Sequence, residues 1–174
     1  EGYLWDTDDS KDASRKAIRA AKEAGARVAL TLSDSFCVGR FRDEFLGLMQ
    51  HDLDIIFANE AEAHSLFETE DFAIVTERMQ AWGGLAALTR SAKGCVVVKG
   101  PDVHAVTAAP VAKVVDTTGA GDLFAAGFLF GLAQGKGLAD CGKLGALAAA
   151  EIISHYGARP EVSLKDLAAK AKLI

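Results

Sequence analysis

Short apolar segments alternate with helical patterns along the first half of the chain. Residues 9–24 repeat apolar positions at helical spacing behind the potential N-caps Asp9 and Ser10, and Gly25 follows as a stop. Three leucine-rich or β-branched segments have the continuous apolar character of strands buried on both faces: 27–34, 54–59 and 85–89. Between them the pattern predicts helices at 41–50, from 60 onward and at 72–82. The alternation predicts an α/β fold with a mainly parallel sheet covered by helices.

The pattern changes in the second half. Segments 95–100 and 103–108 again resemble strands, but only the turn Gly100-Pro101-Asp102 lies between them, which is too short for a helical crossover. They predict an antiparallel hairpin at an edge of the sheet. Beyond residue 112 the chain is helical, with helices predicted at 120–133, 138–155 and 163–172. The opening residues EGYLWD resemble the end of a strand.

The composition, together with the alternation of helices and strands, predicts a single soluble α/β domain that comprises residues 1–174. Half of the residues are hydrophobic, enough for one substantial core, and no apolar run approaches the roughly 18 residues that span a bilayer. The net charge is −5 and the basic residues are scattered, so a nucleic-acid partner is not expected. The three cysteines and four histidines form no CxxC or HxxxH pair, which argues against disulfides and zinc. We therefore expect a cytoplasmic protein with no membrane partner.

The most unusual stretch is VVDTTGAGDLFAAGFLFG, residues 114–131. A helix that begins at Ala120 offers unpaired amide N–H groups and the positive end of its macrodipole, which together form an anion site. Gly119 and Gly121 would let the backbone approach a ligand and adopt conformations that a Cβ forbids. Asp122 in the first turn could then act as a general base for an attacking hydroxyl. The pattern suggests phosphoryl transfer, which relies on positioning and charge neutralisation.

Simpler interpretations of this stretch exist. An aspartate in the first turn is commonly only a partner of the helix dipole, and Asp-Thr-Thr is commonly only a cap. The apolar helix favours the catalytic interpretation, because five residues should anchor the turn in the core: Leu123, Phe124, Phe128, Leu129 and Phe130. Two other nucleotide motifs are not matched, since GKG at 135–137 is no P-loop and Phe124 stands where a dinucleotide fingerprint needs glycine.

DTTGAGDLFAAGF resembles the C-terminal signature of the PfkB, or ribokinase-like, family of sugar and nucleoside kinases. NEAE at 59–62 is similar to the family's Asn-x-x-Glu element, and TRSAKG at 89–94 resembles its Thr-x-Gly-x-x-Gly strand end, with Ser91 where glycine is usual. The resemblance implies a ribokinase-like three-layer α/β/α fold. It also implies ATP-dependent phosphorylation of a hydroxymethyl group on a nucleoside or sugar, with Mg²⁺ and, as in several members, K⁺.

The resemblance assigns catalytic roles to individual positions. Asp122 matches the base that deprotonates the acceptor hydroxyl. The anion hole for the transferring phosphoryl group would comprise Gly119, Ala120 and Gly121. Asn59 and Glu62 would organise Mg²⁺ through water. Both also follow a strand end, where open α/β sheets collect ligands; apart from the family pattern, an ordinary helix start is the better explanation.

Further positions match nucleotide, ion and substrate contacts of the family. Three residues would lie near the nucleotide: Thr89, Lys93 and Gly94. Asp116 and Thr118 match positions that, with carbonyls near Gly157, hold K⁺ in several members. Phe36 would stack on or near the nucleoside base and contact the substrate together with Asp122, although a core phenylalanine is an equally good interpretation.

Several alternatives remain open at this level. TLSDSF, DIIFANEAEA and HYGARPE look most like adenosine kinases and their bacterial relatives, so adenosine is the favoured acceptor. Other sugar kinases of the ribokinase, fructokinase or 2-keto-3-deoxygluconate kinase type are possible, as are a non-catalytic nucleotide-binding module and an ATP-independent phosphosugar binder. The resemblance covers only the C-terminal half of such a kinase, without the N-terminal lid and substrate portion. We therefore expect either a homodimer or a complementing N-terminal half.

Overall fold

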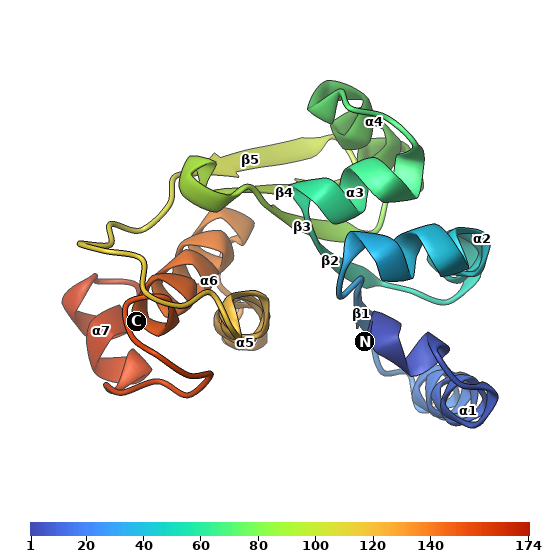
Figure 1. Cartoon of the computed structure of the whole chain (residues 1–174), viewed down its shortest axis with the longest axis horizontal. Helices are drawn as coiled ribbons and strands as arrows, with labels where there is room; N and C mark the ends of the chain where they lie inside the picture. Colours follow the sequence, from blue (N-terminus) through green and yellow to red (C-terminus); the bar gives the residue numbers. More distant parts are fainter. The chain divides into compact units, whose positions relative to one another are not determined.

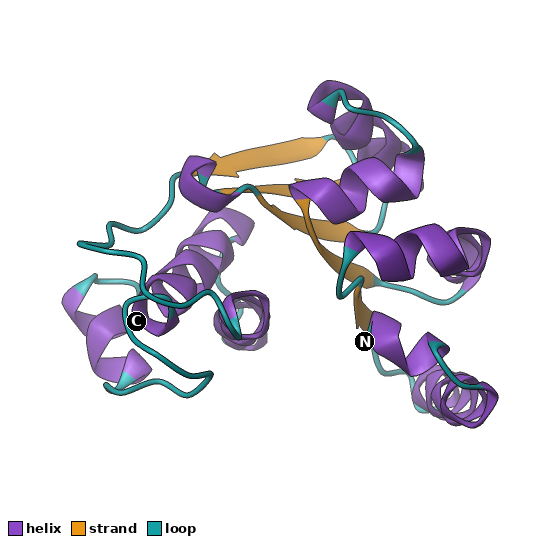
Figure 2. Ribbon diagram, in the orientation of Figure 1, coloured by secondary structure: helices purple, strands orange, loops and turns teal.

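The computed structural model describes all residues, 1–174, and shows an α/β fold built on one five-stranded sheet (Figure 1). The strands are hydrogen-bonded in the order β1-β2-β3-β4-β5. The chain groups into two compact units: the first comprises Glu1–Leu88 and Val98–Val103, and the second comprises Thr89–Val97 and His104–Ile174. Figure 2 shows that helices make up most of the chain outside the sheet.

The first half of the chain alternates helices and strands, as its pattern predicts. Its elements follow in this order: η1 (Gly2–Trp5), α1 (Asp8–Glu23), β1 (Ala29–Thr31), α2 (Ser35–His51), β2 (Ile55–Asn59), α3 (Glu60–Phe67), α4 (Phe72–Trp82) and β3 (Leu85–Thr89). Strand β1 runs parallel to β2, with Leu30 opposite Ile56. Every residue of β2 and β3 except the last is buried, so both faces of these strands are covered.

The second half begins with two chain reversals and continues as helices. Its elements are η2 (Ser91–Lys93), β4 (Cys95–Lys99), β5 (Asp102–Val106), α5 (Ala120–Ala133), α6 (Leu138–Ile152) and α7 (Leu164–Lys170). Only Gly100 and Pro101 join β4 to β5, which confirms the predicted antiparallel edge hairpin. The connection from β3 to β4 is also short and is closed by a 2.7 Å bond from Arg90 N–H to the Gly94 carbonyl, so β4 is antiparallel to both neighbours.

Glycines allow α5 and α6 to pack closely in the second unit. A Cβ on Gly127 would lie 2.6 Å from the Leu144 carbonyl oxygen, and one on Gly145 would lie 2.8 Å from that of Phe124. Such distances leave no room for a side chain. The small-residue segment 144–151 of α6 therefore packs tightly against α5.

Helix starts differ from the predicted ones where a cap residue lies upstream of the apolar pattern. The α1 helix begins at Asp8 because Thr7, and neither Asp9 nor Ser10, is its N-cap and accepts from the Ser10 N–H. The α2 helix begins at Ser35, six residues before the predicted start, because Asp34 caps it; the backbone is kinked at Phe41.

The ends of the chain correct two further predictions. Gly2–Trp5 form the 3₁₀-helix η1, so the opening residues are not the end of a strand. The α6 helix ends at Ile152, three residues earlier than predicted, and no residue of α1 is buried despite its apolar spacing. All three cysteines are free and buried. None of the helices combines the length and apolar character that crossing a membrane would require.

Candidate functional site

The loop before α5 leaves backbone donors open. Gly119 is the N-cap of α5, with φ 78° and ψ 2°, and no side chain caps the helix. The Ala120 N–H donates to the Thr117 carbonyl at 3.1 Å, whereas the N–H groups of Gly121 and Asp122 make no hydrogen bond within the protein. With the helix dipole behind them, these donors can receive an anion.

Asp122 lies in the first turn of α5 beside these donors. Its side chain is exposed, and its carboxylate makes no hydrogen bond or ion pair. A carboxylate committed to capping would be bonded to a backbone N–H group. Asp122 is therefore free to accept a proton from a ligand.

The two glycines of the turn have different reasons to be glycine. Gly119 adopts the left-handed conformation, and a Cβ built on it would lie 3.1 Å from the Ala158 Cβ. Gly121 has no positive φ, and a Cβ there would meet nothing within 4 Å. The prediction that a Cβ forbids the backbone conformation holds for Gly119 and is wrong for Gly121, whose neighbourhood is open.

Asp116 and Thr118 form a hydrogen-bonded turn with Gly157. The Asp116 carboxylate accepts from the Thr118 N–H at 2.9 Å and hydroxyl at 2.7 Å, and from the Gly157 N–H at 3.1 Å. The bonds from the Thr118 and Gly157 amides, followed by the Thr118 hydroxyl bond, lower the pKa of Asp116. The structure thus brings together the three positions at which the resemblance suggests K⁺.

Only part of the apolar α5 surface is covered. Phe124 and Phe128 are buried and their rings stack 6.2 Å apart. Leu129 is 37% exposed and Phe130 46% exposed, so the prediction that all five apolar residues anchor the turn in the core is wrong for these two. The reason is geometric, because a helix that is apolar on every side can turn only some of its faces toward one neighbouring layer.

Asn59 and Glu62 begin α3 as a capping box. The Glu62 carboxylate accepts from the Asn59 N–H at 2.9 Å and from the Asn59 amide at 2.6 Å, while the Glu62 N–H donates to Asn59 Oδ1 at 2.9 Å. Glu62 is 5% exposed, and its burial raises the pKa of its carboxyl group. The helix-start interpretation therefore describes the observed contacts.

The same pair was expected to organise Mg²⁺. No group of three or more histidine, cysteine, aspartate or glutamate side chains is arranged to hold a metal. Glu62 is 5% exposed and each of its oxygens accepts a bond from Asn59, so its carboxylate has little access to a metal ion. Mg²⁺ keeps several of its own waters when it binds proteins. These two residues fit it only as hydrogen-bond partners of those waters.

Phe36 lies in the first turn of α2 and is 84% exposed, so its interpretation as a core residue is wrong. The preceding Asp34 accepts from the Cys37 N–H at 2.7 Å and from the Tyr3 hydroxyl. The bond from Tyr3 lowers the pKa of Asp34, and the bond to Asp34 raises the pKa of Tyr3 to about 12. Residue type alone did not single out Tyr3 or Asp34, although an aspartate between a strand and a helix is a cap signal.

The predicted nucleotide segment is the connection after β3. Thr89 ends β3, and Ser91, at the position where the family often has glycine, adopts a left-handed φ of 51°. Gly94 has φ 88°, and a Cβ on it would lie 2.0 Å from the Val106 carbonyl oxygen. Packing against β5 therefore explains Gly94 without a nucleotide. Lys93 is exposed in η2.

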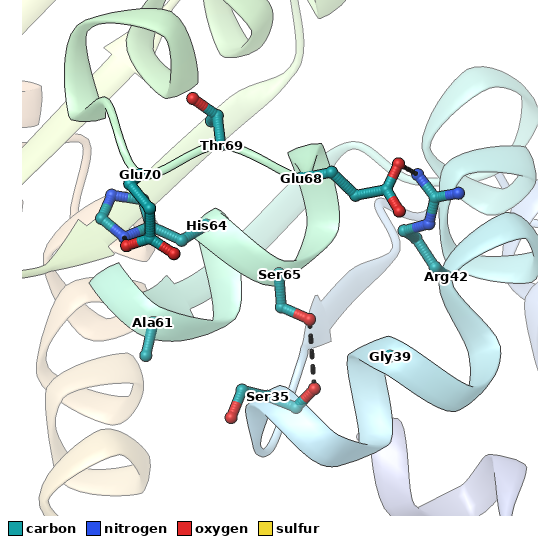
Figure 3. Close-up of a pocket in the computed structure, with 9 residues that line it drawn as sticks. All are labelled: Ser35, Gly39, Arg42, Ala61, His64, Ser65, Glu68, Thr69 and Glu70. Atoms are coloured by element: carbon teal, nitrogen blue, oxygen red, sulfur yellow. Dashed lines mark hydrogen bonds and ion pairs between the residues drawn. The ribbon is translucent and has the colours of Figure 1, made fainter.

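A cavity of about 490 Å³ lies in the first unit, between residues of α2, α3 and the loop after α3 (Figure 3). It is lined by Ser35, Gly39, Arg42, Ala61, His64, Ser65, Glu68, Thr69 and Glu70. Arg42 pairs with Glu68 at 2.7 Å, and Ser65 donates to the Ser35 carbonyl at 3.1 Å. None of the predicted site residues lines this cavity, and its charged groups are largely paired with one another.

The predicted residues are divided between the two units. Phe36, Asn59 and Glu62 belong to the first unit, whereas the Asp116–Asp122 turn and the segment from Thr89 to Gly94 belong to the second. Each set is built locally, the first by helix caps and the second by a left-handed turn. Each set can therefore be described by itself.

Comparison with known proteins matches this chain to one family. The family described as pfkB family carbohydrate kinase matches residues 1–164. A probable sugar kinase from Rhizobium etli is 50% identical, with a TM-score of 0.97 over 99% of this chain and 53% of that chain. An adenosine kinase from Sinorhizobium meliloti is 53% identical, with a TM-score of 0.95 over 98% of this chain and 52% of that chain.

A more distant structure shares the fold. A ribokinase II described as putative, from E. coli in complex with ATP and Mg²⁺, is 19% identical, with a TM-score of 0.85 over 98% of this chain and 56% of that chain. These matches confirm the ribokinase-like three-layer α/β/α class. The chain spans about half the length of the curated relatives and solved structures that it matches.

Proposed function

The chain belongs to the pfkB family of carbohydrate kinases, and on that premise we propose that it carries the phosphoryl-transfer machinery of an ATP-dependent kinase. The reaction would phosphorylate a hydroxymethyl group of a nucleoside or sugar. The observation that carries the proposal is the start of α5, where two N–H groups and the Asp122 carboxylate are all without partners. A structural cap would have used them.

Each residue of this turn has a chemical task in the proposed reaction. Asp122 accepts the proton of the acceptor hydroxyl while the hydroxyl oxygen forms a bond to the γ-phosphorus of ATP. The bond between that phosphorus and the β,γ-bridging oxygen breaks, and ADP leaves with the electron pair. The N–H groups of Gly121 and Asp122, with the α5 dipole, stabilise the negative charge on the transferring group. The left-handed Gly119 precedes these donors as the N-cap of α5.

The cofactors proposed are ATP and Mg²⁺. Mg²⁺ would neutralise the phosphate charge, and Asn59 and Glu62 would hold it through its waters. Thr89 and Lys93 would lie beside the nucleotide. K⁺ would bind near Asp116, whose carboxylate is kept ionised by its three donors.

A nucleoside, with adenosine favoured, is the proposed acceptor. The 53% identical structure from Sinorhizobium meliloti is an adenosine kinase, and the exposed ring of Phe36 offers a face on which a base can stack. The 50% identical Rhizobium etli protein is a probable sugar kinase, which keeps a sugar acceptor as the second candidate. The unbonded Asp122 beside two open N–H groups favours a catalytic turn over a non-catalytic module.

The proposed kinase also needs a partner for its exposed apolar surface. Leu129 and Phe130 leave one side of α5 uncovered. We propose that a complementing N-terminal half or a second copy of the chain covers this surface. Gel filtration should therefore show association, and a monomer that binds no hydrophobic dye would contradict it.

Calorimetry of Mg-ATP with the intact protein tests the function directly, followed by turnover with adenosine and with ribose. We expect saturable binding, tighter in K⁺ than in Na⁺, and faster turnover of adenosine. Asp122→Asn should bind Mg-ATP normally but turn over poorly. Absence of binding by the wild type would leave the non-catalytic module as the better interpretation, and unchanged turnover in Asp122→Asn would remove the base assignment.

A further inference from the structure

Glu151 is a buried carboxylate that the proposed reaction does not use. It lies in the last turn of α6, its side chain is 6% exposed, and Oε2 has no hydrogen-bond partner. Burial of a carboxylate is unfavourable unless hydrogen bonds compensate for the lost water. The hydrogen bonds to Oε1 must therefore compensate for the burial of the Glu151 carboxylate.

Oε1 of Glu151 binds both ends of the loop that follows α6. It accepts from the Glu161 N–H at 2.8 Å and from the Val162 N–H at 3.3 Å, and His155 Nε2 lies 3.1 Å away. The other ring nitrogen of His155 is 3.2 Å from the Tyr156 carbonyl oxygen, so both nitrogens face acceptors. Only an imidazolium can donate to both. One carboxylate oxygen thus closes residues 154–162 into a loop.

The middle of this loop touches the turn that carries the proposed anion site. The Gly157 N–H donates to the Asp116 carboxylate at 3.1 Å. The Ala158 Cβ lies 3.1 Å from where a side chain of Gly119 would begin. The Val115 N–H also donates to the Ile153 carbonyl at 2.8 Å, immediately after α6. The loop and the turn are therefore packed together at several points.

We propose that Glu151 is a positioning residue for phosphoryl transfer. It holds the loop 154–162 in the shape that presses Gly157 and Ala158 against Asp116 and Gly119, and so fixes the direction of the open N–H groups of α5. This inference rests on the proposed function for its catalytic consequence, whereas the loop contacts stand independently of it. Small misplacements of such donors lower turnover because charge stabilisation depends on their geometry.

The test compares three substitutions of Glu151 with one matched control in the intact protein. Glu151→Ala removes the acceptor, Glu151→Asp keeps the charge but is too short to reach both loop amides, and Glu151→Gln keeps an acceptor oxygen. Asp140→Asn is the control, because it neutralises an exposed carboxylate in the first turn of the same helix, paired with Lys143. NMR measures the exchange of the Gly157 N–H, and a kinase assay measures kcat and KM.

Glu151→Ala should speed exchange of the Gly157 N–H about fivefold, as the loss of one hydrogen bond does. It should also lower kcat roughly 10- to 100-fold while KM for ATP changes less than about threefold. Glu151→Gln should recover most of kcat, and the control should match the wild type. Wild-type exchange at Gly157 in Glu151→Ala would overturn the proposal, and so would an unchanged kcat despite faster exchange.

Two further outcomes are also decisive. If Glu151→Ala does not fold, Glu151→Asp takes its place, and wild-type exchange at Gly157 in that variant would overturn the proposal. If the wild type turns over no acceptor, the proposed kinase function fails. The exchange of the Gly157 N–H then still decides whether Glu151 holds the loop, because that measurement requires no activity.

Discussion

Gly119 and Gly121 flank the same alanine, yet alanine substitutions at the two positions should have opposite effects on stability. Gly119 has φ 78°, and a residue with a Cβ pays roughly 1–2 kcal/mol in that region. Its Cβ would also lie 3.1 Å from the Ala158 Cβ, inside the ordinary contact distance of roughly 3.5–4.0 Å. We expect Gly119→Ala to lower the free energy of unfolding by about 2 kcal/mol.

Gly121 is the matched control within the same turn. Its backbone is helical, and a Cβ there would meet nothing within 4 Å. Alanine should therefore raise the free energy of unfolding by roughly 0.5–1 kcal/mol, the usual gain over glycine in a helix. The expectation from sequence that a Cβ is forbidden at Gly121 therefore has no steric basis.

Urea denaturation of the two variants and the wild type, followed by circular dichroism, measures the difference. The two free energies of unfolding should differ by roughly 2–3 kcal/mol, with Gly119→Ala the less stable. If the two variants differ by less than about 0.5 kcal/mol, the backbone conformation assigned to Gly119 does not constrain that position. In turnover assays Gly121→Ala should be slower than the wild type without being less stable, because its methyl group enters the open space beside the anion donors.

Three other predictions each concern one residue. Asp122→Asn should lower kcat by about 100-fold or more with an unchanged urea midpoint, and equal kcat would contradict its role as base. Gly94→Ala should lower the free energy of unfolding by roughly 2–5 kcal/mol, because its Cβ would meet the Val106 carbonyl at 2.0 Å; a wild-type urea midpoint would contradict this. The Tyr156 carbonyl, with Glu151 and Glu161, raises the pKa of His155 in the folded protein. The contribution of the protonated ring to stability is therefore complete below about pH 6.5, the pKa of an unfolded histidine, and is lost as the pH rises through the higher pKa of the folded state. The gap in urea midpoint between wild type and His155→Gln should therefore be larger at about pH 5 than at about pH 9, and a constant gap would refute it.

The elements were predictable wherever local pattern and packing agree. The bounds of α4, β3 and α5 match those predicted, because each has a clear apolar pattern and a glycine or polar residue at its end. The starts of α1 and α2 could not be predicted in this way, because Thr7 and Asp34 cap these helices ahead of their apolar positions. A cap depends on a single side-chain bond, which periodicity does not register.

The candidate site divides in the same way. The motif GAGD identified a helix start with open donors, and NEAE identified a capping residue pair, because both are contiguous in sequence. Residue order alone did not separate the two roles of Asn59 and Glu62 or the different constraints on Gly119 and Gly121. Residue order also did not connect Glu151 with the Asp116–Asp122 turn, since Glu151 binds the loop around Gly157 and that loop contacts the turn.

The sequence by itself determined the family, the α/β class and the contiguous turn that offers an anion its N–H groups. These depend on residues within a few positions of one another, where propensity and hydrogen bonding act directly. Only the tertiary structure decided that Phe36 is exposed, that Gly94 is constrained by packing and that a buried carboxylate closes the loop beside Asp116. Burial and close approach depend on which distant segments pack together, and that arrangement is a property of the folded chain as a whole.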